Sequence, residues 1–394
     1  MNSPRRLPGW LWPALLIAMG CGLRIAPWTS FDGIAYDESW YRKYVLALDA
    51  NGPATYPELC AAYLEDGRDA LTPAKVPPLR ALFVTASWVW MRVAGGEALA
   101  AMHRISTLFG CLSLVAAWGF ARRLFTEKEA LGVLALFACS PLLMHMSQHP
   151  LIDGVYAACA LFAFWALWES MRPGAHRAWL AALAVSFAVL VLAKENAVFP
   201  ALGFAAIMLL GKADRRHWLA VTAGGLAAVT LLAAAAGGFR AMFEVYGLFI
   251  RKVQELPYAR QTGDGPWSRY LVDLMIFTPA TLCFALGGAF RTLREDRRAA
   301  VLLWFLAVTY IAMCNVRYGM NLRYTTIWEF PLRALAVVQV SALTSRLRYS
   351  GAAFALSVAV LCAIDLAQYR QFFVTHRLYE LPTEYLLRAE KILK

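Results

Sequence analysis

The feature that most constrains the fold of this chain is a series of long apolar segments separated by short polar loops. Crossing the hydrocarbon core of a bilayer takes about 20 predominantly apolar residues. Segments of this kind fall near residues 10–28, 98–120, 130–147, 151–170, 178–193, 196–211, 218–237, 269–290, 299–314, 324–344 and 350–368. Hydrophobic residues make up 60% of the chain and charged residues 16%. The sequence therefore predicts an all-α, polytopic integral membrane protein with about 11 transmembrane helices.

The charges of the short loops predict an orientation. With the apolar stretch 77–94 lying in the interface, every short loop on one side holds at least two Lys or Arg, beginning with MNSPRR, and the opposite turns hold few. This is the positive-inside pattern, which would be reversed if 77–94 crossed the membrane. We therefore expect a cytoplasmic N-terminus, an outer C-terminus and one membrane domain over 1–394. Its outer parts are the loops 29–97, with interfacial helices, and 238–268, and an amphipathic tail, 369–394.

The net charge of +12 points to anionic lipid headgroups, because no basic helix with interleaved aromatic residues indicates nucleic-acid binding. Arginine and alanine usage indicates a bacterium with a GC-rich genome, and so an inner (plasma) membrane. The chain has no Walker, GxSxG or HExxH motif, which excludes the chemistry that depends on those motifs. We see no Gly- or Pro-broken pair of spans of the kind that transporters use.

The stretch FDGIAYDESWYR, 31–42, carries three carboxylates among aromatic residues directly after the first span. A carboxylate at a membrane boundary is partly desolvated, which raises its pKa toward the value of a useful general base. Asp37 and Glu38 are therefore the first candidates for catalysis, and Asp32 is a candidate helix cap. The alternative is a solvated loop with incidental acids.

A basic group follows, which could hold a phosphate because Lys and Arg are its natural partners. Arg104 lies near the outer end of a predicted span, where an ionisable residue is costly and indicates a site. Snorkelling to the interface or pairing with an acid is the alternative. The group consists of Lys75, Arg80, His103 and Arg104.

Two outward turns carry further ionisable residues. In MHMSQHPLID, His149 and Asp153 are spaced i, i+4 and are candidate metal ligands, whereas a structural hydrogen bond is the favoured interpretation of His145. In the next hairpin, Lys194 either neutralises Glu195 or reaches a phosphate.

A third outward turn, 315–324, is a candidate site for a phosphate or a sugar. Its candidate ligands are Arg317, Arg323 and Tyr324. Beyond it, Glu329 and Arg333 are spaced i, i+4 inside a span, and we interpret them as a structural ion pair. The ionisable residues thus gather at one face of the membrane, which favours surface chemistry over transport.

The order of these features resembles the GT-C glycosyltransferases of the protein O-mannosyltransferase and lipid A aminoarabinose transferase superfamily (PMT-like, ArnT-like). Asp37-Glu38 with Tyr41 resembles the Asp-Glu motif of the first outer loop, and KVPPLRALF, from Lys75, resembles the Lys-Pro-Pro segment. GGEALAAMHRISTLFG places Arg104 at the family's arginine position. The chain departs from the aminoarabinose type at Trp40, where that type has Arg, and at Ala74, where it has a Glu.

The resemblance implies a GT-C fold and a polyprenyl-phosphate-linked sugar as donor. It implies that Asp37 is the base, that Glu38 supports it, and that Lys75 and Arg104 are phosphate or site-ordering residues. The acceptor would be a lipid, polysaccharide or protein, and a divalent metal is compatible with the family. The alternative is a non-enzymatic protein that binds or translocates a polyprenyl lipid.

Overall fold

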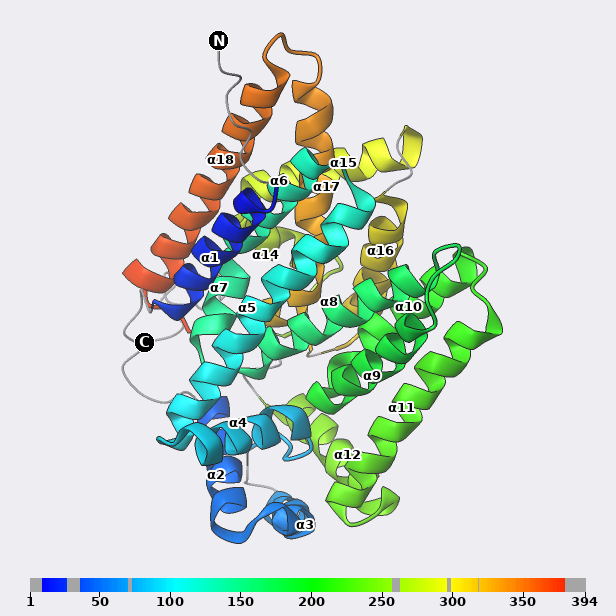
Figure 1. Cartoon of the computed structure of the whole chain (residues 1–394). Helices are drawn as coiled ribbons and strands as arrows, with labels where there is room; N and C mark the ends of the chain where they lie inside the picture. The colour runs from blue at the N-terminus through cyan, green and yellow to red at the C-terminus, as the bar shows by residue number, and fades with distance from the viewer. Residues whose placement is uncertain are drawn as a thin grey trace.

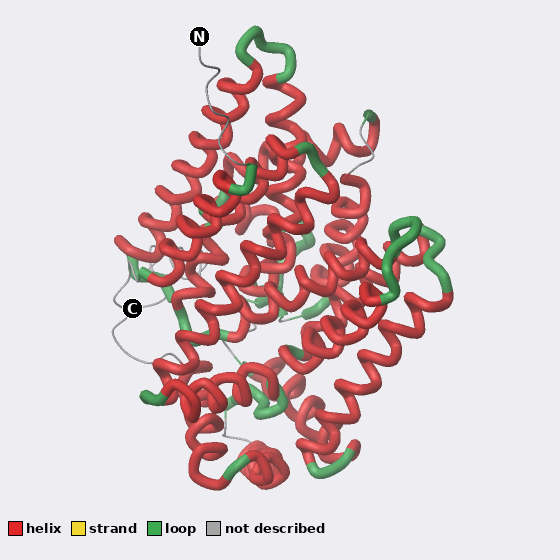
Figure 2. The backbone as a smooth tube through the Cα atoms, in the orientation of Figure 1, coloured by secondary structure: helices red, strands yellow, loops and turns green. Residues whose placement is uncertain are grey.

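The computed structural model describes residues 9–26, 36–69, 73–256, 263–295, 299–317 and 319–379. Within these ranges every regular element is helical, and no strand is formed (Figure 2). Asp32 and the predicted amphipathic part of the tail beyond Pro382 lie outside the described residues.

Helices occupy all the predicted spans and the predicted interfacial stretch. In the first half of the chain they are α1 (Leu11–Ile25), α2 (Tyr36–Asn51), α3 (Tyr56–Arg68), α4 (Ala81–Ala94), α5 (Ala98–Leu124), α6 (Glu127–Ala138), α7 (Pro141–Gln148), α8 (Ile152–Ser170) and α9 (Ala178–Ala193). In the second half they are α10 (Val198–Leu210), α11 (Arg215–Ala236), α12 (Phe239–Glu255), α14 (Arg269–Phe277), α15 (Pro279–Arg294), α16 (Ala300–Cys314), α17 (Glu329–Thr344) and α18 (Ser350–Tyr369). Among the residues that the structure describes, the short turns of 3-10 or π-helix are η1 (Pro53–Thr55), η2 (Glu195–Ala197), η4 (Leu322–Trp328) and η5 (Arg370–Thr375).

Four of the described helices are long and apolar enough to cross a membrane alone, and the bent pair α6–α7 makes up to five. The other apolar helices are shorter, so the predicted number of about 11 spans remains a prediction. Helices α2, α3, α4 and α12 gather at one end of the helical body, opposite the connection between α17 and α18 (Figure 1). There α4 lies across the end of α5 (Figure 1), the arrangement expected of an interfacial helix.

Small residues let the helices approach closely, as is common in membranes. A side chain at Gly224 of α11 would collide with the backbone of Ala184 in α9, and one at Gly288 of α15 would collide with the backbone of Leu335 in α17. These contacts hold α9 against α11 and α15 against α17. The loops at the α2–α4 end are thereby carried on a closely packed body.

One predicted span, 130–147, is broken, which corrects the expectation that no span is interrupted at Pro. It forms α6 and α7, which meet at an angle of 51°. The break follows from Pro141, which cannot donate a backbone hydrogen bond, and from Ser140, whose side chain caps α7 by accepting from the backbone N–H of Leu143. The predicted span 269–290 is also interrupted at a proline, with α15 beginning at Pro279.

The carbonyls that this break frees are bonded by two buried arginines. Arg24 donates to the carbonyls of Phe137 and Ala138, and Arg333 donates to that of Leu136. In a bilayer no water can bond these oxygens, so the protein itself must do so.

The predicted pair of Glu329 and Arg333 is confirmed, and a third charge completes it. Arg333 contacts Glu329 within α17 and Asp365 of α18, the latter at 3.1 Å. All three side chains are at most 1% exposed. We call these three residues the Arg333 cluster. Its carboxylates also accept hydrogen bonds from Ser140, Thr278 and Thr281.

Candidate active site

Asp37 lies in the first turn of α2, where a carboxylate is favoured by the positive end of the helix dipole. Its Oδ2 is 3.2 Å from Nη1 of Arg323, which is 286 residues away in the sequence. A quarter of the Asp37 side chain is exposed, whereas that of Arg323 is mostly buried. The carboxylate is thus held in a fixed position and is still reachable from outside.

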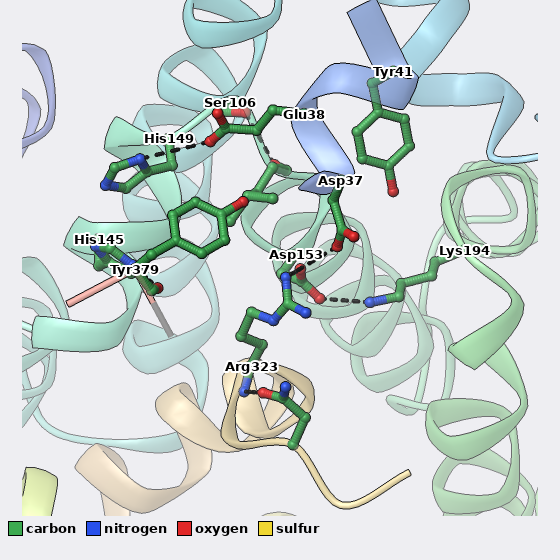
Figure 3. Close-up of polar contacts among 12 residues, drawn as sticks. Asp37, Glu38, Tyr41, Ser106, His145, His149, Asp153, Lys194, Arg323 and Tyr379 are labelled. Atoms are coloured by element: carbon green, nitrogen blue, oxygen red, sulfur yellow. Dashed lines mark hydrogen bonds and ion pairs between the residues drawn. The ribbon is translucent and has the colours of Figure 1, made fainter. Parts of the chain in front are cut away.

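Arg323 also links Asp37 to a second, buried acid. Its Nη1 is 4.0 Å from Oδ2 of Asp153, at the start of α8 (Figure 3). The other oxygen of Asp153 accepts a hydrogen bond of 2.6 Å from Nζ of Lys194, and both side chains are at most 3% exposed. Asp37, Arg323, Asp153 and Lys194 form what we call the Asp37 cluster.

A backbone turn positions the arginine of this cluster. Asn321 caps η4 by accepting a hydrogen bond from the backbone N–H of Arg323. The next residue, Tyr324, places its ring 4.3 Å below Nζ of Lys194. The predicted Arg–Tyr pair therefore contacts both ends of the Asp153–Lys194 ion pair.

A second ion pair lies beside the cluster. Arg80, which precedes α4, donates to both carboxylate oxygens of Glu195 and to the hydroxyl of Tyr41. Burial alone would lower the pKa of Arg80, but the attraction of Glu195 raises it well above its ordinary value. In turn, burial opposes ionisation of Glu195, and the attraction of Arg80 holds its pKa below the usual 4.5. Both groups are therefore charged at neutral pH.

Glu38 points to the other side of α2, toward the paired histidines. Its Oε1 lies 3.8 Å from Nδ1 of His149, and both side chains are 3% exposed. Burial lowers the pKa of His149 to about 3, so its ring is neutral at pH 7. The predicted structural role of His145 fits its contact with the carbonyl of Tyr379, 2.9 Å from Nε2.

A cavity of about 630 Å³ adjoins Glu38 and His149 between α1, α4, α5 and α7. Two of the predicted basic residues, His103 and Arg104 of α5, line it. Apolar side chains such as Leu99 and Leu108 line it as well. Glu38 thus stands between this cavity and the Asp37 cluster.

Two predicted site residues lie apart from the Asp37 cluster. Lys75 forms an ion pair of 2.8 Å with Asp66 and lies over the ring of Trp40. Arg317 is exposed after α16, and no described ion pair joins it to Asp37 or Asp153. Both remain candidates for contacts with a ligand, and neither helps to hold the cluster.

The proposed metal ligands do not converge. His149 faces Glu38, whereas Asp153 is bonded to Lys194 and neighbours Arg323. Over the ranges that the structure describes, no three His, Cys, Asp or Glu residues come together to hold a metal ion. These residues do not fit a metal centre, and we assign no chemical step to one.

The sequence does not predict the roles of two residues of the site. It places Arg80 only in a basic group, although its position between Pro77-Pro78 and an interfacial helix marks where the loop returns to the membrane. It gives no local signal for Tyr379, which is one aromatic residue in an amphipathic tail.

Comparisons with known proteins agree with this architecture. A family model described as dolichyl-phosphate-mannose-protein mannosyltransferase matches residues 75–237. Among curated proteins no sequence match is found.

Solved structures share the fold at low sequence identity. ArnT from Cupriavidus metallidurans in the apo state is 15% identical, with a TM-score of 0.54 over 92% of this chain and 72% of that one. The same protein bound to undecaprenyl phosphate gives a TM-score of 0.56 over 93% and 76%. The Archaeoglobus fulgidus oligosaccharyltransferase is 14% identical, with a TM-score of 0.60 over 93% of this chain and 56% of that one. This chain therefore spans little more than half of the oligosaccharyltransferase.

Proposed function

We propose that this chain, which shares a fold with ArnT and matches a dolichyl-phosphate-mannose-protein mannosyltransferase model over residues 75–237, is a GT-C membrane glycosyltransferase that transfers a sugar from a polyprenyl-phosphate donor. The acceptor is a hydroxyl or phosphate group on a lipid, polysaccharide or protein. The reaction takes place on the outer face of a bacterial inner membrane, with the N-terminus in the cytoplasm. The whole chain, 1–394, acts as one GT-C domain whose outer loops, 29–97 and 238–268, surround the site.

The observation that carries this proposal is the contact of Asp37 with Arg323. A general base must be reachable by its substrate and fixed in position. Asp37 meets both conditions, because it is partly exposed and bonded to an arginine that is itself anchored between Asp37 and Asp153. Asp153 is buried against Lys194 and meets only the second condition.

For a hydroxyl acceptor, the step balances as follows. The acceptor oxygen attacks the anomeric carbon of the donor sugar, and the bond from that carbon to the phosphate oxygen breaks. The hydroxyl proton passes to the carboxylate of Asp37, and the polyprenyl phosphate leaves with the bonding electron pair. Fixed cations stabilise that developing negative charge. Arg323 contacts the base, and Arg104 lines the cavity that adjoins Glu38.

The cavity beside Glu38 supports a lipid substrate. It combines the cation of Arg104 and the imidazole of His103 with apolar walls. A phosphate on an isoprenoid chain presents the complementary pair of properties, an anionic head and an apolar tail. We propose that this cavity receives the lipid-linked phosphate and that Glu38 separates it from the base.

The test is transfer by purified protein in proteoliposomes, with undecaprenyl phosphate carrying labelled hexoses as donors. We expect Asp37→Asn to lower kcat by about 10³-fold, within the 10²–10⁴ range of general-base catalysis. Binding of the donor, measured as its shift of the melting temperature, is retained.

The matched control is Asp49→Asn in the same helix, since Asp49 pairs with Arg92 at the surface and lies 39% exposed. This control should transfer sugar at the wild-type rate. Equal transfer by Asp37→Asn and wild type would remove Asp37 as the base and leave Glu38 as the candidate. A folded wild type that binds undecaprenyl phosphate and transfers no sugar would instead favour a lipid-binding or lipid-translocating protein.

A further inference from the structure

The C-terminal segment 370–379 turns back from α18 into the site. After η5, Arg377 takes a left-handed conformation with φ of +50°. The backbone N–H of Leu378 then bonds the carbonyl of Phe372 at 3.1 Å, and the Leu378 side chain is 1% exposed. A left-handed residue followed by a buried apolar one is how helices are commonly ended and redirected. The direction of residue 379 is therefore set by a formed turn.

Two contacts with His145 fix this turn against α7. The ring of Phe373 stacks on that of His145, with centroids 3.7 Å apart and planes 12° apart. The carbonyl of Tyr379 lies 2.9 Å from Nε2 of the same histidine. Both contacts are made without the side chain of Tyr379. The backbone at residue 379 is thus held by contacts that do not involve its own side chain.

The ring that is placed in this way lies inside the candidate active site. It meets His149 edge to face, with centroids 5.8 Å apart and an angle of 80°. In Figure 3 the ring extends from the His145 side toward Glu38. The side chain is half-buried. A large aromatic side chain therefore lies on the side of the site that carries Glu38 and His149.

We propose that Tyr379 is a sugar-binding residue whose ring forms one wall of the subsite for the transferred sugar. This inference rests on the proposed function. A pyranose presents a face of C–H groups, which packs on an aromatic ring, and an edge of hydroxyls, which needs polar partners. Tyr379 supplies the ring, and Glu38 and His149 stand beside it as the polar partners.

The experiment compares Tyr379→Leu and Tyr379→Phe with wild type in two measurements. The first is the transfer kinetics with undecaprenyl phosphate hexose. We expect Tyr379→Leu to raise the donor KM about three- to tenfold, the range for losing one aromatic packing contact, and to change kcat less than the KM. Tyr379→Phe keeps the ring and should stay near the wild-type KM.

The second measurement distinguishes binding of the sugar from binding of the lipid phosphate. Undecaprenyl phosphate without sugar should raise the melting temperature of wild type and Tyr379→Leu equally. Undecaprenyl phosphate hexose should stabilise wild type more than Tyr379→Leu. A purely structural role of Tyr379 would weaken the response to both ligands alike, and that result would overturn the proposal.

The matched control is Arg377→Gly in the same turn. Glycine adopts the left-handed conformation without strain, so this variant keeps the turn and should keep the wild-type KM.

A wild-type donor KM in Tyr379→Leu would refute the inference while leaving the proposed function intact. A rise in turnover in Tyr379→Leu would also refute it, because it would identify the segment 370–379 as a plug. If wild type gains no stability from any undecaprenyl phosphate hexose, the proposed function fails, and this inference fails with it.

Discussion

The Arg333 cluster and the Asp37 cluster are both built from buried ion pairs, yet their surroundings differ. In the first, every charged side chain is at most 1% exposed, and hydroxyl groups of three neighbouring residues bond the carboxylates. In the second, one carboxylate is 25% exposed, and the link from Arg323 to Asp153 is stretched to 4.0 Å. A closed ionic network stabilises a packing arrangement, whereas one with a reachable carboxylate can also act on a substrate.

The largest effect is expected from Arg333→Met. Removing the cation leaves Glu329 and Asp365 buried without their partner, which costs about 3–5 kcal/mol for an ion pair of this kind. The measurement is thermal unfolding of the purified protein in detergent. The control is Arg346→Met, which removes an exposed arginine between α17 and α18. Equal melting temperatures for these two variants would show that the Arg333 cluster does not hold the spans together.

The next largest effect is expected from Arg323→Met, and it is an effect on activity. Without this guanidinium the base loses its anchor and the developing charge loses a stabilising cation, which should lower kcat/KM by about 100-fold or more. Arg346→Met serves as the control, because it removes an exposed arginine at the connection between α17 and α18, at the opposite end of the body, and should alter kcat/KM only slightly. The two clusters would be alike after all if Arg323→Met unfolded as readily as Arg333→Met.

The effect that is smallest near neutral pH concerns protonation. The pKa of His149 is lowered from 6.5 to about 3 by burial, so between these values the unfolded chain binds a proton that the folded protein does not. The free energy of unfolding is therefore not reduced by His149 above pH 6.5, and it falls as the pH drops from 6.5 toward 3. His149→Gln should flatten the dependence of melting temperature on pH over this window. His176→Gln, at an exposed histidine between α8 and α9, should leave it unchanged.

The two clusters also show which features of the structure can be predicted from the sequence. The positions of the apolar helices follow from hydrophobicity alone, and the pair of Glu329 with Arg333 follows from i, i+4 spacing. The loop charges predicted one shared outer face, and Asp37, His149, Lys194 and Arg323, which come from four separate predicted outer turns, do lie together. Topology was enough to place these residues on one side of the body.

The partners of these residues could not be predicted in the same way. Asp365 joins Arg333 from another helix, and Arg323 joins Asp37 from 286 residues away. Such contacts depend on how packed helices are rotated, which no local spacing records. The break at Pro141 did have a local signal, a Ser-Pro pair at the start of α7, but the continuous hydrophobicity of 130–147 concealed it.

The bent span α6–α7 has a consequence for how the chain is assembled during synthesis. Arg24, which bonds two of the freed carbonyls, is made before the bend, whereas Arg333, which bonds the third, is made long after it. Glu329, which accepts the hydroxyl of Ser140, is also made late. The ribosome must therefore deliver α17 before the bend acquires all its bonds. A nascent chain that stops short of α17 therefore carries a bend in which the carbonyl of Leu136 and the hydroxyl of Ser140 lack the partners that α17 supplies.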